Sequence, residues 1–407
     1  MKKLSFLLGL ASIFSASFAA SDYTCAGRDS PKLPGSAYRL KESIDWNLST
    51  LRKHFSDRGK LATVSDVLDS ANHQLIKLDA RGWASVTRVT AVPQSVYRWE
   101  STTEGFDDFG TKKWYPQGVT SSSDAFQVGT YEGRNAWIMS WYDDTDGKES
   151  VRVTFVDKKT GKYRHALLVV PNTPELYSGT PSPATDFKRL GIHAGGIVWY
   201  GSTLWVVDTS KGIRVFDLNN IWQVEAGDEV GKMSNGQFSA QGYLYVIPQI
   251  RTYTWTPKTE KEKFRFSWIS LDRVGTDKIL VGEYAGSTTP DSTPIRMAQY
   301  ELDYTVRKLQ TSSQIATSSW AYCVDILEMQ GAISHGDKFY ISTSNPNYGL
   351  GDLWTWTPGN RARESRAWLP PGPEDMTWDE VTQTFTTISE HPGKRFIVTY
   401  KGTQAPF

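Results

Sequence analysis

The spacing of hydrophobic positions along this chain changes once, near Trp83. Before that residue they recur at steps of three and four, which is the spacing of one helix face. Two such series occur, Leu40–Phe55 and Val64–Leu78. Thr63 and Asp66 have the spacing of a capping pair at the start of the second. The pattern therefore predicts two helices near the N-terminus.

After Trp83 the apolar and polar residues alternate in short runs separated by turn residues, which predicts β-strands. The clearest unit is Gly191–Leu218, where Gly201-Ser202 and Thr209–Gly212 separate three apolar runs. Glycines precede the first of these runs. They indicate that this strand passes close to another part of the chain.

The segment before the first strand of this unit recurs along the chain. The similar segments are PQGV (116–119), HAGGI (193–197), AQGY (240–243), MQGA (329–332) and PEDM (373–376). Their spacing fits one or two repeats of about 40 to 50 residues, which is typical of propeller blades. We therefore predict an all-β fold, a β-propeller with five blades, with six or seven as alternatives. A β-sandwich would leave the recurring segment unexplained.

The first 20 residues have the pattern of a secretory signal peptide. Lys2 and Lys3 precede the apolar run Leu4–Phe14, and small residues lead up to Ala19 and Ala20. The run is too short for a transmembrane anchor, and no later run reaches about 18 apolar residues. We expect an extracellular protein without a membrane span. The expected organisation is a signal peptide (1–20), an N-terminal lead-in with helices (21–82) and the propeller domain (83–407).

Charge and cysteine content limit the partners. The chain has 45 Lys and Arg against 44 Asp and Glu, which argues against nucleic acid or an anionic membrane. Cys25 and Cys323 predict one disulfide in an oxidising compartment, with two free thiols as the alternative. No His and Cys spacing typical of a metal site, no phosphate loop and no Gly-x-Ser-x-Gly turn occurs. We expect no metal and no cofactor, while the oligomeric state stays open.

The residues of the recurring segment are candidates for a functional site. The first strands of propeller blades line a central channel, and the segments that precede these strands converge at its mouth. Asp208 and Asp325 follow apolar strands, where a partly buried carboxylate needs a partner or a function. Glycines beside His193 let a ligand approach. The candidate catalytic residues are Asp208, Asp325, Glu374, Asp375 and His193.

The candidate ligand-binding residues are polar or aromatic and lie near the same recurring segment. They are Gln117, Arg214, Gln241, Gln249, Gln330, Trp199 and Trp378. Arg214 either pairs with Asp208 or binds an anionic substrate. The glutamines can instead hydrogen-bond a neighbouring blade, and the tryptophans can pack between blades rather than stack on a sugar.

Two carboxylates facing one channel are what glycoside hydrolysis requires. We therefore expect the ligand to be an extracellular carbohydrate or another small molecule, bound in the central funnel and hydrolysed or cleaved by a lyase reaction. Whether the protein is an enzyme stays open. One alternative is a non-catalytic, lectin-like or protein-interaction module acting as a secreted effector. Another is a calcium-dependent propeller esterase or lactonase.

Several segments carry a resemblance to known proteins, among them IHAGGIVWYGSTLWVVDTSKGIRVFDL, MQGAISHGDKFYISTS and GPEDMTWDEVTQTFTTISEHPGKR. Between Trp114 and Arg395 the chain resembles a group of secreted propeller-like hypothetical proteins common in actinobacteria and filamentous fungi. The resemblance implies secretion and a repeated fold. It implies no activity.

Overall fold

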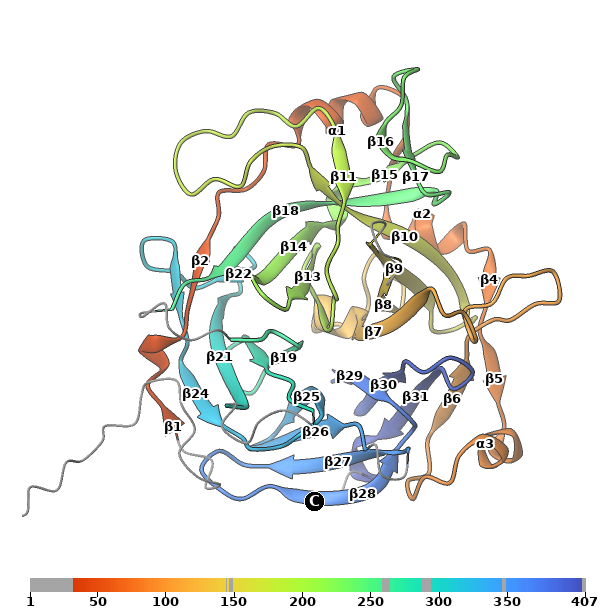
Figure 1. Ribbon diagram of the computed structural model, residues 1–407, viewed down its shortest axis with the longest axis vertical. Helices are drawn as coiled ribbons and strands as arrows, with labels where there is room; N and C mark the ends of the chain where they lie inside the picture. Colours follow the sequence, from red (N-terminus) through yellow and green to blue (C-terminus); the bar gives the residue numbers. More distant parts are fainter. Residues whose placement is uncertain are drawn as a thin grey trace, which may run out of the picture.

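Five β-sheet blades surround a central axis in the computed structural model, which confirms the predicted five-bladed β-propeller (Figure 1). The structure describes residues 32–143, 145, 149–257, 264–286, 294–345 and 349–404. The predicted signal peptide and Cys25 lie outside these residues. Cys323 is buried and is not a free thiol, so its pairing with Cys25 stays a prediction.

Each blade is an antiparallel sheet whose first strand lies nearest the axis. Blade one contains β7 (Trp114–Ser121), β8 (Ala136–Asp143), β9 (Ser150–Asp157) and β10 (Lys162–Pro171). Blade two contains β12 (Ile197–Tyr200), β13 (Thr203–Asp208), β14 (Gly212–Asp217) and β18 (Tyr245–Trp255). The turn between β7 and β8 holds the short helix α4 (Ser122–Ala125).

The remaining blades follow in chain order. Blade three contains β19 (Trp268–Asp272), β20 (Lys278–Gly282), β21 (Arg296–Asp303) and β24 (Trp320–Cys323). Blade four contains β25 (Met329–His335), β26 (Lys338–Thr343), β27 (Gly351–Trp356) and β28 (Arg363–Leu369). Blade five contains β29 (Pro373–Asp379), β30 (Thr384–Ser389) and β31 (Phe396–Lys401).

An N-terminal strand completes blade five and closes the ring. β6 (Ser95–Arg98) pairs with β31, so that Arg98 lies opposite Phe396. Because β6 precedes β7 in the chain, the loop between them connects blade five directly to blade one. The two ends of the propeller are thereby held in one sheet.

The long strand β18 follows AQGY (240–243), one of the segments that the repeat places before the first strand of a blade, but it is the outer strand of blade two. It pairs antiparallel with β14 along blade two, and its first part runs parallel to β10 of blade one. Blades one and two therefore form one continuous sheet. A strand that departs from its own hairpin order carries no local signal of which blade it will join.

The N-terminal segment contains both helices and strands. The first predicted helix is wrong in its first half, where β2 (Arg39–Glu42) pairs with β18, and α1 covers Ser49–Ser56. The second predicted helix is wrong in its second half: α2 covers Val64–Asp69, and the residues up to Leu78 form strands. The predicted capping box of Thr63 and Asp66 is confirmed. The other elements of this segment are β1 (Lys32–Leu33), β3 (Leu61–Ala62), β4 (His73–Gln74), β5 (Ile76–Leu78), α3 (Ala80–Val86) and the 3-10 turn Gly35–Ala37. Its strands pair with outer strands of the blades.

Several short elements lie at the periphery of the propeller. They are β11 (Phe187–Arg189), β15 (Ile221–Gln223), β16 (Val230–Lys232), β17 (Phe238–Ala240), β22 (Lys308–Leu309), β23 (Ile315–Thr317) and the 3-10 turns Leu218–Asn220 and Gly402–Gln404. Among the helices that the structure describes, none is long and apolar enough to cross a membrane.

The innermost strands touch one another around the axis, as the glycines before them predicted. A Cβ atom on Gly196 of blade two would lie 2.5 Å from the backbone nitrogen of Ile269 in blade three. A Cβ on Gly331 of blade four would lie 2.6 Å from the Cα of Asp375 in blade five. Only glycine permits such contacts. Further out, apolar side chains fill the space between neighbouring blades, as Ile333 and Met376 do between blades four and five.

Candidate functional site

The innermost strands all begin at one face of the propeller, which we call the mouth. Three of them carry a β-bulge within the recurring segment. The bulges lie at Gln117 in β7, at Gln330 in β25 and at Glu374-Asp375 in β29. A bulge leaves its extra residue out of the hydrogen-bond ladder and redirects its side chain. The repeated bulge therefore turns polar side chains from several blades toward the mouth.

Glu374 is the most unusual residue of this group. It is 2% exposed, and its carboxylate has no hydrogen-bond or ion-pair partner within the described part of the chain. Burial raises the pKa of the Glu374 carboxyl well above its usual range, and the negative charges of Glu390 and Asp375 raise it further. This environment favours the protonated form of Glu374.

Glu390 lies beside Glu374 in the turn between β30 and β31. Gln117 Nε2 donates to Glu390 Oε2 at 3.0 Å, and His391 Nδ1 lies 3.5 Å from Glu390 Oε1. On balance burial raises the pKa of Glu390, although His391, the Gln117 hydrogen bond and Arg395 act in the opposite direction. The site thus holds two carboxyl groups in different environments, one without a partner and one whose ionised form is favoured by the Gln117 hydrogen bond and the charge of Arg395.

Blades three and four contribute a second polar pair. The Tyr284 hydroxyl, after β20, donates to Glu328 Oε2 in the segment that leads into β25. Burial and this hydrogen bond raise the pKa of Tyr284, and the charges of Glu374 and Glu390 raise it further. Tyr284 therefore lies within the electrostatic field of both carboxyl groups of blade five.

Aromatic rings lie at the mouth on blades one and two. The ring of Tyr142 stacks on that of Tyr115 at 5.4 Å between centroids, and on that of His193 at 4.3 Å. Both tyrosines are half-buried and His193 is exposed. Such a row offers flat apolar surface of the kind on which a sugar ring can pack.

Asp375 lies deeper than Glu374 and has no exposed surface. It accepts hydrogen bonds from the backbone N–H groups of Ile197 (3.2 Å) and Met376 (2.9 Å). Burial raises its pKa well above the usual range, although these backbone hydrogen bonds act in the opposite direction. The side chain fills the axis beneath the mouth and is cut off from any ligand there.

Asp208 and Arg214 form an ion pair within blade two. The Arg214 Nε lies 2.8 Å from Asp208 Oδ2, and Arg214 Nη1 donates to Gln249 Oε1 at 3.0 Å. Asp208 and Gln249 are buried. The arrangement has the geometry of a structural pair linking β13, β14 and β18, which was one of the two interpretations of Arg214.

Three other candidates are located as follows. Asp325 is exposed, so its expected partial burial is wrong; it follows β24 with φ of 51°. Gln330 lies at the mouth and donates to Ser344 Oγ at 3.3 Å.

Gln241 does not precede an innermost strand, because AQGY forms the peripheral turn between β17 and β18. Its assignment to the mouth is therefore wrong. Blade three instead begins at Ser267-Trp268, without glycine.

The two candidate tryptophans do not line the mouth. Trp199 is fully buried and packs against Tyr131 at 4.8 Å, so a sugar cannot reach its ring. Trp378 lies near the end of β29, and its ring stacks on that of His335 at 4.4 Å. It belongs to the opposite face of the propeller.

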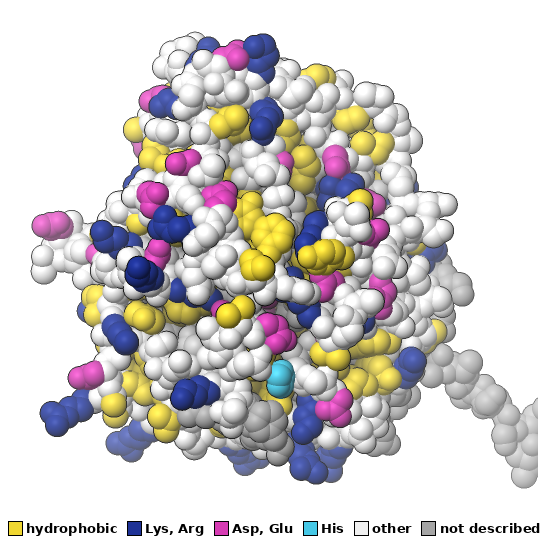
Figure 2. Space-filling model, turned by 180° about the vertical axis from the view of Figure 1, so that it is seen from behind, with side chains coloured by type: hydrophobic (Ala, Val, Ile, Leu, Met, Phe, Trp, Pro, Cys, Tyr) yellow, Lys and Arg dark blue, Asp and Glu magenta, His cyan; other side chains and the backbone are white. Residues whose placement is uncertain are grey.

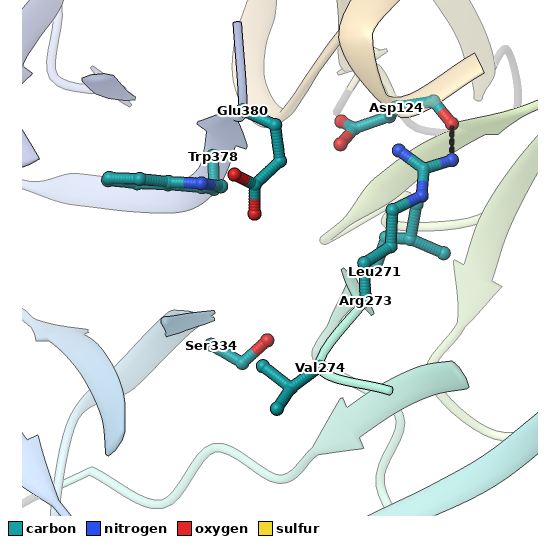
Figure 3. Close-up of a pocket in the computed structure, with 7 residues that line it drawn as sticks. All are labelled: Asp124, Leu271, Arg273, Val274, Ser334, Trp378 and Glu380. Atoms are coloured by element: carbon teal, nitrogen blue, oxygen red, sulfur yellow. Dashed lines mark hydrogen bonds between the residues drawn. The ribbon is translucent and has the colours of Figure 1, made fainter. Parts of the chain in front are cut away.

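A small pocket occupies that opposite face, where the innermost strands end (Figure 3). Arg273 donates to the backbone oxygen of Asp124 at 2.6 Å, and Asp124 accepts hydrogen bonds from Thr377 (2.6 Å) and Thr120 (2.7 Å). The Glu380 carboxylate is exposed at its rim. Because the buried carboxylate of Asp124 already has its donors, it differs from the carboxylate of Glu374 at the mouth.

Glu390, Tyr284 and Glu328 were not recognised from the sequence. Glu390 follows Ser389, which lies opposite Pro373 in the sheet, and this places it next to Glu374. A sequence signal existed: the turn Glu390–Gly393 ends a strand that returns to the mouth beside PEDM. Tyr284 and Glu328 carried no comparable signal, because their contact joins two different blades.

Among the described residues, no group of three or more His, Cys, Asp or Glu side chains could hold a metal ion. Acidic, basic and hydrophobic side chains are interspersed over the face in Figure 2. No surface area of a single charge stands out there.

The chain matches no family model and no curated relative. Solved structures similar to it include the GH43_1 enzyme from Xanthomonas citri complexed with xylose, at 10% identity over 76% of this chain and 89% of that chain, with a TM-score of 0.34. Hydrazine synthase from Kuenenia stuttgartiensis matches at 11% identity over 71% and 80%, with a TM-score of 0.30. The β-propeller domain of Cps50 (Swd1) from Myceliophteria thermophila matches at 9% identity over 71% and 97%, also with 0.30. Likeness at this level carries no argument about activity.

Proposed function

We propose that this protein binds a carbohydrate at the mouth of its propeller and hydrolyses a glycosidic bond with Glu374 and Glu390. The observation that carries the proposal is the pair itself: a buried, partnerless carboxyl beside a second carboxyl that has donors. Two carboxyl groups whose environments separate their protonation states are what this chemistry requires.

The two residues have distinct roles in the proposed reaction. Glu374, whose environment favours the protonated form, donates its proton to the glycosidic oxygen as the bond to the anomeric carbon breaks. Glu390 in its ionised form activates water or attacks the anomeric carbon, and the hydroxyl of water ends on that carbon. The Tyr115, Tyr142 and His193 rings support the sugar.

The test is an assay of the purified protein against a panel of polysaccharides and aryl glycosides. We expect activity that falls by at least about 100-fold in Glu374→Gln and Glu390→Gln. Glu380→Gln, in the same blade but at the opposite face, is the matched control and is expected to keep wild-type activity. A wild-type protein that neither binds nor cleaves any member of the panel would refute the proposal.

A lectin-like protein without catalysis is the second candidate, favoured by the aromatic row at the mouth. It predicts saturable binding of a carbohydrate without any release of reducing ends. Under this alternative Glu374→Gln changes affinity but no turnover exists to be lost. Calorimetry together with a reducing-end assay separates the two functions.

We also propose that the protein is secreted. The apolar run Leu4–Phe14, preceded by lysines and followed by small residues, supports cleavage near Ala20. N-terminal sequencing of the protein recovered from culture medium tests this. A protein retained in the cell with residues 1–20 still attached would contradict it.

A further inference from the structure

Arg395 is a fully buried cation that lies next to the proposed site. It has no exposed surface and precedes β31, at the end of the turn that begins with Glu390. Its guanidinium lies over the ring of Tyr115 at 5.2 Å and over that of Trp141 at 5.8 Å. Burying an arginine costs free energy that its surroundings must offset.

The hydrogen bonds of Arg395 connect the proposed site to the closure of the ring. Arg395 Nε donates to the backbone oxygen of Glu390 at 2.7 Å, and Nη1 donates to the backbone oxygen of Asp108 at 3.0 Å. Asp108 belongs to the loop between β6 and β7, which joins blade five to blade one. One side chain thus fixes the Glu390 turn to the point where the propeller closes.

These two hydrogen bonds do not pair the positive charge of Arg395 with a carboxylate. Its Nη2 is buried and has no hydrogen-bond partner among the described residues, and the acceptors of its Nε and Nη1 are neutral carbonyl groups. Neutral donors could bond the same carbonyls without burying a charge. The charge of Arg395 acts on two carboxylates, Asp108 and Glu390, and it favours the ionised form of Glu390 against the burial that raises the pKa of that group.

Other groups also affect the ionisation of Glu390, and their effects must be distinguished from the effect of Arg395. Burial opposes its ionisation, Gln117 on β7 donates to it, and His391 in the same turn lies 3.5 Å from it. Behind Arg395 lies Arg152, which pairs with Asp108 at 2.7 Å. Burial and the charge of Arg152 lower the pKa of Arg395 to about 10, so Arg395 stays protonated at neutral pH.

We infer that Arg395 is a positioning residue that holds the Glu390 turn at the mouth through the backbone oxygens of Glu390 and Asp108, and that its buried charge favours the ionised form of Glu390 beside Glu374. The role in catalysis rests on the proposed function, but the effect on Glu390 does not. Arg395 itself touches no ligand, because its side chain is covered by Tyr115 and Trp141.

The experiment measures the ionisation of Glu390 directly, by NMR titration of the protein with ¹³C-labelled glutamate, assigned with Glu390→Gln. In Arg395→Met the pKa of Glu390 is expected to rise by about one pH unit or more, because an opposite charge nearby has been removed. In Arg395→Lys, which keeps a positive charge, the rise is expected to be smaller. Arg164→Met is the matched control, since Arg164 donates to the backbone oxygen of Ser70 on the outer part of blade one.

If activity is found, the acid limb of its pH profile is expected to move to higher pH in Arg395→Met by the same amount. A folded Arg395→Met protein with an unchanged Glu390 titration would overturn the inference, even if hydrolysis is confirmed. Loss of folding in both Arg395 variants would overturn it in favour of a purely structural role. A shifted titration in a protein that cleaves no glycoside would support the inference and refute the proposed function.

Discussion

Asp375 accepts a hydrogen bond from the backbone N–H of Ile197 across the axis of the propeller, with 3.2 Å between the nitrogen and Oδ2. The two residues belong to the innermost strands of blades five and two, which are separated in the ring by blade one. Together with Gly331, which leaves room for the Asp375 backbone, this contact closes the centre of the ring. The axis beneath the mouth is therefore filled by a carboxyl group.

This contact predicts how the stability of the protein depends on pH. Burial raises the pKa of Asp375, so the folded protein holds a proton that the unfolded chain loses above about pH 4. The stabilisation is complete below that pH and declines as the pH rises toward the folded pKa. In Asp375→Asn the free energy of unfolding should therefore fall less steeply between pH 4 and 7. Urea denaturation across this range measures it, and equal slopes in both proteins would contradict the assignment.

The buried ion pair of Asp108 predicts the opposite dependence. Although burial raises the pKa of Asp108, the charge of Arg152 and the hydrogen bond from His165 hold it well below its usual range. Its contribution is present above about pH 4 and is lost as the pH falls. Asp108→Asn should destabilise the protein by about 3 to 5 kcal/mol at pH 7, because Arg152 loses its partner. The difference from wild type should narrow on acidification; a constant difference down to pH 3 would argue against the ion pair.

A hydroxyl group links blades four and five close to the site. Ser342 Oγ donates to the backbone oxygen of Glu374 at 2.9 Å, as Ser140 Oγ does to Ala194 between blades one and two at 3.0 Å. Ser342→Ala should lower the free energy of unfolding by about 1 to 3 kcal/mol, because a buried carbonyl loses its donor. Ser342→Thr keeps the hydroxyl and serves as the comparison. Equal stability of Ser342→Ala and wild type would show that this carbonyl finds another donor.

Two aromatic residues are expected to respond differently to truncation. Trp199→Ala removes a fully buried ring and should destabilise the protein by about 3 to 5 kcal/mol. Tyr142→Ala removes a half-buried ring at the mouth and should weaken carbohydrate binding with a much smaller loss of stability. Thermal unfolding and calorimetric titration of both variants test this. Weaker binding in a folded Trp199→Ala protein, with unaffected binding in Tyr142→Ala, would place the ligand elsewhere.

The fold was largely predictable from sequence, because the segment before each first strand must let innermost strands touch. Glycine at Gly196 and Gly331 meets that demand, and its recurrence revealed the blades. The same argument misplaced Gln241, because a glycine in a peripheral turn has the same local pattern. The place of a strand in the ring depends on its contacts with other blades. The sequence of a single segment carries no information about those contacts.

The site was predictable only in part, for a related reason. Glu374 belongs to a recurring segment, so its place at the mouth followed from the repeat. Glu390 and Tyr284 reach the mouth from returning strands and from another blade, and their proximity to Glu374 arises from the closed ring. Trp199 faces the core instead of the channel, since the inner strand turns that side chain toward Tyr131.

The balance of charge at the mouth predicts which sugars are excluded. Glu374 and Glu390 face it, and Arg395, whose charge acts on Glu390, is buried beneath it. A ligand carboxylate or sulfate would therefore lie near the Glu390 carboxylate while the guanidinium of Arg395 stays out of its reach, which costs binding free energy. Neutral sugars should bind at least about tenfold more tightly than the matching uronic acids at pH 7. Calorimetry with a matched pair, such as glucose and glucuronic acid oligomers, measures the ratio. The preference should weaken in Glu390→Gln, since the repelling charge of Glu390 is then absent, and equal affinity of both ligands for the wild-type protein would place the binding site away from these two carboxyl groups.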